Sequence, residues 1–303
     1  MQTNQQLVMD RPEPRVGTRP SDASSVKTIL LHVLDDEFHD QRIDTALTLA
    51  RACSGHVSCL HVAPIEAYVA FDTFGGVFVM NDVIRKLEER DVELKRKVEQ
   101  RFEREDASWD YEQVTGNVAS AMISRAALAD VLITTRDPVN RDFVGPTVSF
   151  LGDLLQRSRT PLLIPGSNNA SFDPAGPALI AWNGSVEAAN AVRASVGLLR
   201  LASEVRILEV PEEKQEAKAF PATKLLEYLS RQGVHAELIV EPSPTGDVGH
   251  EVIAGMIVAQ AQGSRAAYVV MGGYSHTRIG EYIFGGVTRT LLRDCPVALV
   301  MAR

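Results

Sequence analysis

The chain has 303 residues, of which 45% are hydrophobic and 23% charged, and its formal net charge is −8. This length and composition are typical of about two globular domains, each able to bury a core. The negative charge, with basic residues spread out rather than clustered, argues against nucleic-acid binding, and no apolar run reaches the roughly 20 residues that span a bilayer.

The N-terminal segment 1–26 is polar, contains three prolines and lacks the apolar core of a secretion signal. We therefore expect a disordered tail and a cytoplasmic protein with reduced cysteines. Cys53, Cys59 and His61 stand close together in the sequence but lack the spacing and the fourth ligand of a zinc site. These two cysteines and Cys295 are expected to be small buried side chains, and no metal site is predicted.

Segment 27–166 shows short apolar runs that alternate with helical patterns. Strands are predicted over 28–34, 57–62, 109–114, 131–134 and 161–164. Helices are predicted from 35 to about 52, over the charged run that ends near 105, and from Asn117. Segment 65–79 is rich in aromatic and β-branched residues, and we interpret it as an insertion. It could cover its own core, line a pocket or bind a partner, and the first of these is the default.

Segment 167–176 is a predicted linker, and 177–303 repeats the same order of elements more compactly. Strands are predicted over 178–182, 205–210, 235–240, 268–271 and 297–301. Asn183-Gly184-Ser185 is predicted to cap a helix that reaches Leu201. Gly233 is predicted to end the helix that starts at Ala222, and Asp247 to cap the helix that follows.

The two halves share five sequence landmarks in the same order. For example, Val57–Pro64 resembles Val205–Glu212, and Ala129–Ile133 recurs as Ala267–Met271. We interpret the chain as two copies of one domain. The alternating elements predict an α/β fold of two Rossmann-like domains, each an open five-stranded parallel sheet flanked by helices. The ligand crevice of such a sheet lies beyond the carboxyl ends of its strands.

The C-terminal stretch from Ala267 is the most informative. It reads AYVVMGGYSHTRIGEYIFGGVTRTLLRDCPVALVMAR, with a glycine pair on each side of a polar loop, and it resembles the end of the universal stress protein domain. That family belongs to the adenine-nucleotide α-hydrolase-like folds, and its ATP-binding members carry Gly-x2-Gly-x9-Gly-Ser/Thr. Gly272 and Gly285 match this pattern, whereas Ser275 replaces a glycine and Gly286 replaces the hydroxyl residue.

The resemblance places the ligand between the first and fourth strands of the second copy. The nucleotide-binding candidates are Asn183, Val210, Gly272, Gly273, Ser275, Gly285, Gly286 and Thr288. Val210 would lie beside an adenine, and Gly285-Gly286 would cradle phosphate with backbone N–H groups or let the last helix approach the sheet. Because Ser275 adds a side chain where phosphate needs a close backbone approach, we expect weakened rather than complete ATP binding.

Several of these candidates have a second interpretation. Asn183 is also explained as a helix cap, since the ATP-binding relatives have Asp there. Gly272-Gly273 would also suit a tight turn with positive φ. Thr288 would donate its hydroxyl to a phosphate or cap the last helix, and His276 and Arg278 would meet an anion or simply lie on the surface.

The first copy has no glycine pair after its fourth strand. Arg136 and Arg141 follow that strand and could hold an anion, but Asp137 and Asp142 offset their charge. We therefore expect the first copy to be structural and to pair with the second through their last strands, which would otherwise be exposed apolar edges. The expected assembly is an intramolecular pseudo-dimer, with a homodimer or a protein partner as further options.

Two functions follow from the resemblance. The first is a non-catalytic binding or regulatory module of the stress response, with at most a degenerate nucleotide site and ATP as its ligand. The alternative is an ATP-binding protein with slow ATPase or adenylating activity. That alternative needs a base or metal-binding carboxylates near the phosphates, but Asp35-Asp36 lies in the other half and the phosphate loop offers only Glu281. No catalytic residue is therefore assigned. Accessory domains of membrane transporters also occur in the family, without a supporting feature here.

Overall fold

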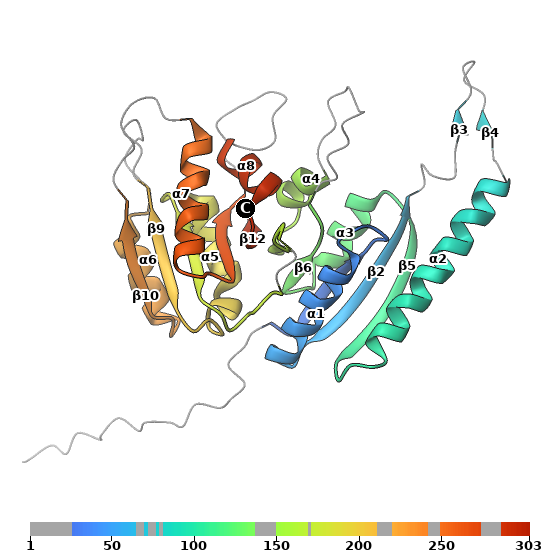
Figure 1. Cartoon of the computed structure of the whole chain (residues 1–303), viewed down its shortest axis with the longest axis horizontal. Coiled ribbons are helices and arrows are strands. Elements are labelled where there is room, and N and C mark those ends of the chain that lie inside the picture. Colours follow the sequence, from blue (N-terminus) through green and yellow to red (C-terminus); the bar gives the residue numbers. More distant parts are fainter. Residues whose placement is uncertain are drawn as a thin grey trace, which may run out of the picture.

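The computed structural model describes residues 26–64, 70–71, 77–78, 81–136, 150–168, 171–210, 220–241, 249–273 and 286–303 (Figure 1). In the N-terminal half, 26–168, the strands of the main sheet are β1 (Thr28–Val33), β2 (His56–Pro64), β5 (Ser108–Gly116), β6 (Val131–Ile133) and β7 (Leu162–Ile164). Its helices are α1 (His39–Cys53), α2 (Asn81–Phe102), α3 (Val118–Ala126) and α4 (Phe150–Arg157). Within the predicted insertion, β3 (Ala70–Phe71) and β4 (Val77–Phe78) pair antiparallel, and its other residues lie outside the described ranges.

The C-terminal half, 171–303, repeats this arrangement. Its strands are β8 (Ala178–Trp182), β9 (Val205–Glu209), β10 (Ala236–Val240), β11 (Tyr268–Gly272) and β12 (Ala298–Ala302). Its helices are α5 (Val186–Leu199), α6 (Ala222–Arg231), α7 (His250–Gly263) and α8 (Gly286–Asp294). Among the described residues, no helix combines the length and apolar character needed to cross a membrane.

The ten strands form one sheet in the order β10-β9-β8-β11-β12-β7-β6-β1-β2-β5. Within each half all neighbouring strands are parallel. If the strands of a half are numbered along the chain, their order from the outer edge to the centre of the sheet is 3-2-1-4-5. The predicted α/β class with a mostly parallel sheet is confirmed. The two five-stranded sheets are not separate, however, because β7 and β12 pair antiparallel, with Leu163 opposite Val300. We call this β7–β12 pairing the seam.

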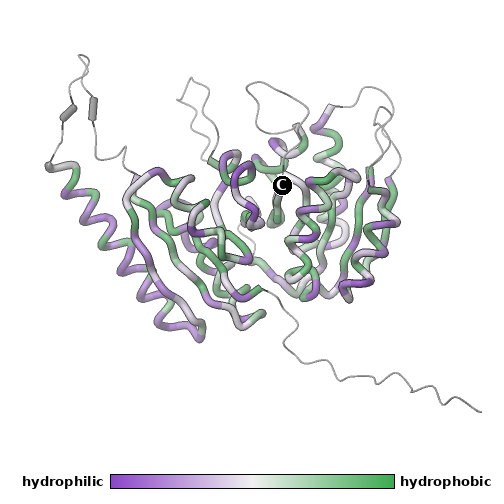
Figure 2. Tube along the Cα trace, turned by 180° about the vertical axis from the view of Figure 1, so that it is seen from behind, coloured by the Kyte–Doolittle hydropathy of each residue, from purple (hydrophilic) through white to green (hydrophobic). Residues whose placement is uncertain are grey.

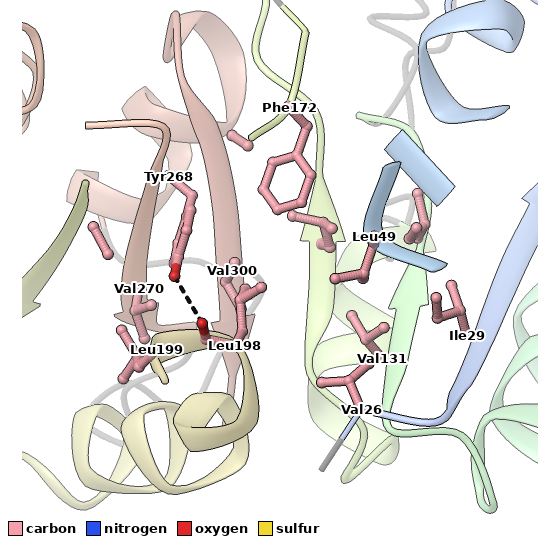
Figure 3. Packing of buried hydrophobic residues seen from close by; sticks show 14 of the residues in the cluster. Val26, Ile29, Leu49, Val131, Phe172, Leu198, Leu199, Tyr268, Val270 and Val300 are labelled. Carbon is pink, nitrogen blue, oxygen red and sulfur yellow. Dashed lines mark hydrogen bonds between the residues drawn. The ribbon is translucent and has the colours of Figure 1, made fainter. Parts of the chain in front are cut away.

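Helices cover both faces of the sheet. Alternate strand residues point to opposite faces, so Ile29 and Leu31 join the hydrophobic cluster under α1, α2, α5 and α6, while Leu30 joins the cluster under α3, α4, α7 and α8. The first cluster contains residues of both halves (Figure 3). Phe172 of the predicted linker packs in it beside Tyr268, with ring centroids 5.8 Å apart, and the Tyr268 hydroxyl donates to Leu198 O at 3.2 Å.

The charged helix predicted before residue 105 is α2. Its outward side carries ion pairs such as Arg96–Glu93, and Leu94, Val98 and Phe102 are buried. Figure 2 accordingly shows hydrophilic residues along much of this outer helix, in contrast to the hydrophobic strands. The structure therefore supports the interpretation of this charge run as a solvated helix face.

Two local predictions need correction. Helix α4 was not predicted, although its buried Leu151, Leu154 and Leu155 have helical spacing. Asp247 lies outside the described residues, and the helix predicted to start there begins at His250, with Gly249 as its N-cap residue. Cap propensity alone does not fix where a helix starts once tertiary packing competes with it. The predicted stop at Gly233 is confirmed, since this residue follows α6 with a φ of 75°.

Candidate functional site

The strand order places a topological switch point at the carboxyl ends of β8 and β11. The two strands pair in parallel, with Ala181 opposite Met271. From there β8 connects through α5 to β9 on one side, and β11 connects through α8 to β12 on the other. Open α/β sheets bind ligands where the connections diverge in this way. We call these two strand ends, with the first turns of α5 and α8, the C-terminal switch point.

Asn183 follows β8 and supports the start of α5 without being its cap. Its Oδ1 atom accepts a hydrogen bond from Ser185 N at 3.2 Å, and Ser185 Oγ accepts one from Ala188 N at 3.1 Å. Ser185 is therefore the N-cap residue of α5. Of the cap predicted over 183–185, the structure gives the capping bond to Ser185. The Asn183 side chain is exposed beside it.

Phe220 also forms hydrogen bonds at the end of β8. Trp182 Nε1 donates to Phe220 O at 3.1 Å, and Phe220 N donates to Gly184 O at 3.2 Å. Trp182 is buried, whereas Phe220 and Val186, the first residue of α5, are exposed apolar side chains. Sequence reasoning missed these contacts, because Phe220 stands 38 residues after Trp182 with no periodic relation to it.

Gly272 lets α5 approach the end of β11. A Cβ atom on Gly272 would stand 2.7 Å from Ala188 N and 2.8 Å from Glu187 C. The three atoms nearest to a Cβ on Gly273 would all belong to the side chain of Leu155, which comes from α4 of the other half. Neither glycine has positive φ, so the interpretation as a tight turn with positive φ is wrong. Close packing of backbones explains Gly272 instead.

Gly286 is the first residue of α8 and lies against His250, the first residue of α7. A Cβ on Gly286 would overlap the His250 side chain, so glycine here lets the starts of the two helices lie together. Thr288 is buried inside the first turn of α8, and the interpretation of Thr288 as the helix cap is therefore wrong. Sequence reasoning also missed His250, because the cap was predicted three residues earlier.

The remaining candidates are only partly described. Val210 follows β9, the neighbour of β8, and is 8% exposed in the cluster under α7 and α8. The described positions Asn183, Val210 and Gly272 therefore follow or end three adjacent strands. Ser275 and Gly285 lie outside the described residues, as do His276, Arg278 and Glu281.

The N-terminal half has a matching switch point at β1 and β6. Leu31 is opposite Ile133 at the last paired position. The two residues that follow are Thr134-Thr135, where the C-terminal half has Gly272-Gly273. Both threonines are buried. The equivalent positions thus carry buried threonine side chains in one half, and glycines against which α5 and Leu155 pack in the other.

These threonines belong to a buried polar cluster. His32 Nδ1 lies 3.1 Å from Thr134 Oγ1, and the His32 ring packs against Phe150 at a centroid distance of 5.4 Å. Arg42 is 1% exposed and donates to His32 O at 3.2 Å, to Leu34 O at 2.7 Å and to Asp36 Oδ2 at 2.9 Å. His32 and Thr134, and Arg42 and Asp36, are thus paired within this switch point.

His61 ties β2 to α2 beside this cluster. Its Nδ1 atom lies 3.3 Å from Val33 O and its Nε2 atom 3.0 Å from Asp91 Oδ1. Asp91 also accepts from Gln113 Nε2 at 3.0 Å. The charged helix is thus attached to the sheet by a polar contact as well as by its apolar side.

The burial of His32 predicts a pH-dependent stability. Burial, and then the Arg42 charge, lower the pKa of His32 from 6.5 to about 3. As the pH drops below 6.5, His32 becomes protonated in the unfolded chain but stays neutral in the folded chain. The free energy of unfolding therefore falls with the pH. Between pH 7.5 and pH 5, His32 is expected to remove about 2 kcal/mol from the free energy of unfolding.

Chemical denaturation at both pH values measures this effect. The His32→Gln variant should lose about 2 kcal/mol less than the wild type over this pH interval. His235→Gln, at an exposed position, is the matched control and should behave as the wild type. Equal losses in the wild type and in His32→Gln would contradict the prediction.

The structure gives Arg136 another role than the anion binding considered from the sequence. Its guanidinium donates to four carbonyl groups, three of which belong to the end of α8 and the residues after it. Asp137, Arg141 and Asp142 lie outside the described residues.

The three cysteines are buried free thiols. Burial raises the pKa of the Cys59 and Cys295 thiols, which disfavours the reactive thiolate. Within the described ranges, no three His, Cys, Asp or Glu side chains come together in a way that would hold a metal ion.

Comparison with known proteins finds a family match over part of this chain. Residues 176–303 match the sequence model of the universal stress protein family. A universal stress protein from Archaeoglobus fulgidus DSM 4304 is similar in structure, with a TM-score of 0.67, 15% identity, and coverage of 93% of this chain and 97% of the other.

Two proteins of Pseudomonas aeruginosa are also similar, both with a TM-score of 0.53 and 14% identity. One, from strain UCBPP-PA14, is named as a universal stress protein, and the alignment covers 92% of this chain and 94% of that one. The other is a functionally unknown protein from strain PAO1, with coverage of 93% and 94%. No curated protein matches the sequence. At these identities the solved structures show a shared fold over both halves, and the predicted domain boundaries at 27–166 and 177–303 stay predictions.

Proposed function

Since residues 176–303 form a universal stress protein domain, we propose that the chain is a tandem universal stress protein. In this proposal it is a non-catalytic binding and regulatory module of the stress response. The C-terminal switch point is its ligand site, and a nucleotide such as ATP is the ligand. The N-terminal half is the structural partner, because its switch point is filled by its own side chains.

The observation that carries this proposal is the close backbone packing at Gly272. The first turn of α5 lies against the end of β11, at the edge of the sheet where such folds bind ligands. Helices α7 and α8 also begin side by side, at His250 and Gly286. Backbone N–H groups at helix starts favour an anion by about 0.3–2 kcal/mol. A polyphosphate is the kind of ligand that suits this edge.

Weak binding is expected rather than tight binding. Ser275 places a side chain where the ATP-binding pattern has glycine, and Gly286 lacks the hydroxyl of that pattern. The alternative function, slow ATP hydrolysis or adenylation, would need a general base beside the attacked phosphate. The phosphate loop offers only Glu281 for that role, and for this reason we favour the binding module.

The proposed assembly is an intramolecular pseudo-dimer. The seam pairs β7 with β12, two strands that would otherwise be apolar edges. A homodimer or a protein partner would then use other surfaces. Small-angle scattering is expected to show one compact particle, and a profile of two beads on a linker would contradict the assembly.

The test of the nucleotide site is calorimetric titration with ATP after removal of any co-purified nucleotide. The wild type is expected to bind ATP, and Gly272→Ala to weaken binding at least about tenfold, because the added Cβ pushes α5 away from β11. Gly116→Ala is the matched control, since nothing lies within 4 Å of its added Cβ.

Three outcomes would contradict parts of this proposal. No heat at millimolar ATP with the wild type would exclude a useful nucleotide site. Unchanged affinity in Gly272→Ala would place any nucleotide elsewhere. Release of phosphate or pyrophosphate in the same samples would favour the enzymatic alternative.

A further inference from the structure

Arg136 crosses from the N-terminal half to α8 of the C-terminal half. It follows β6 by three residues, and its guanidinium is half-buried. Nη1 donates to Leu292 O at 2.7 Å and to Leu291 O at 3.2 Å. Nη2 donates to Cys295 O at 2.7 Å and to Pro165 O at 3.1 Å. One side chain thus binds the carboxyl end of α8 and the end of the β7 segment together.

These four bonds suit the chemistry of both partners. The last carbonyl groups of a helix lack the full set of intrahelical N–H donors and carry the negative end of its dipole. Here Leu291 O also accepts from Cys295 N at 2.9 Å, and Arg136 adds a charged donor to it. A guanidinium is always charged and presents several N–H donors in a fixed plane, so it can serve carbonyl groups on both sides. Hydrogen bonds from a charged donor are stronger than neutral ones.

Helix α8 joins this contact to the C-terminal switch point. Its first residue, Gly286, lies against His250, and its last turn ends in the Arg136 contact. Leu291 and Leu292 are buried in the cluster shared with α7, so the helix is held along one side as well. In Figure 1, α8 lies near the middle of the molecule, between the bulk of the two halves. The helix has nine residues, so the Arg136 contact lies only about two turns from Gly286.

We propose that Arg136 couples the two halves by fixing the carboxyl end of α8 and, through this helix, the position of its amino end. This inference rests on the proposed function only for the identity of the ligand at that amino end. By linkage, a ligand bound there and the Arg136 contact would affect each other by the same free energy.

A second contact across the halves provides the control. Arg303 Nη1 donates to Gln156 O of α4 at 3.0 Å, at an exposed position. This bond joins the C-terminus to the N-terminal half without involving α8. Arg303→Ala therefore removes a cross-half bond of the same chemical type and leaves the end of α8 untouched.

The primary measurement is amide hydrogen exchange of the full chain, read by mass spectrometry in peptides that cover α8. In Arg136→Ala, exchange over residues 287–294 is expected to be roughly tenfold faster than in the wild type, because several charged hydrogen bonds are lost. Arg136→Lys should be intermediate, since one ammonium group cannot reach all four carbonyl groups. Arg303→Ala should match the wild type, and β1 peptides report whether the whole chain has been destabilised.

Unchanged exchange of α8 in Arg136→Ala would overturn the proposal. Faster exchange confined to residues 291–294, with 287–290 as in the wild type, would also overturn it, because Arg136 would then be a local helix cap. Titration with ATP is the second readout, and Arg136→Ala should weaken binding about fivefold. If the wild type binds no ATP, the nucleotide site fails, while hydrogen exchange still decides the coupling.

Discussion

Replacing Arg42 by methionine is expected to lower the free energy of unfolding by about 3–5 kcal/mol. Arg42 is 1% exposed and its guanidinium binds two carbonyl groups and the Asp36 carboxylate. Methionine fills a similar volume without any donor. Asp36 and the carbonyl groups of His32 and Leu34 would then lose their charged partner in a region from which water is largely excluded. Denaturant unfolding monitored by circular dichroism measures the effect.

Two further variants test whether the loss of stability comes from the unpaired Asp36 and carbonyl groups or from removing any arginine. Arg51→Met removes an arginine from the same helix, but Arg51 pairs with Glu105 at a partly exposed site, and a loss below about 1 kcal/mol is expected. In Arg42→Met with Asp36→Asn, part of the loss should be recovered, because the uncompensated charge is gone. A loss in Arg42→Met as small as that in Arg51→Met would refute the argument.

Gly166→Ala is expected to cost about 3 kcal/mol, at the upper end of what overpacking does. Gly166 is buried just after β7, and a Cβ there would overlap Pro296 O and stand 2.8 Å from Pro296 C. The obstacle is backbone, so no side-chain rotation relieves it. The shift would also disturb Gln41 Nε2, which donates to Gly166 O at 2.9 Å.

The control for this variant is a glycine with free space around it. Gly255 lies within α7, and an added Cβ meets nothing within 4 Å. Gly255→Ala should be neutral or stabilise the chain by up to about 1 kcal/mol, because alanine is the better helix former. Equal thermal stability of the two variants would show that the close approach at Gly166 does not matter.

The sequence predicted the fold where one physical signal was sufficient. The strand over 178–182 was located correctly, because a buried apolar run ends at Asn183-Gly184. Helix α4 was not predicted because it is only eight residues long, although its buried leucines have helical spacing. The start of α7 was predicted three residues early from a capping preference, and that preference contains no information on contacts such as the one between His250 and Gly286.

In the candidate site, too, local signals were visible in the sequence and contacts between distant residues were not. Gly272 was recognised from its motif, but the reason for glycine there is the backbone of α5, 84 residues earlier in the chain. Arg136 was considered as an anion-binding residue whose charge Asp137 offsets, and its carbonyl partners on α8 stand about 155 residues later. Contacts of this separation leave no pattern in a single sequence, whereas strand ends and glycine pairs do.

The packing of Phe172 has a consequence for how the chain melts. The hydrophobic cluster that contains it includes residues of both halves, so neither half has a core that ends at its own boundary. We therefore expect one cooperative thermal transition instead of two. A ligand that binds the C-terminal half alone would then raise the melting temperature of the N-terminal half as well.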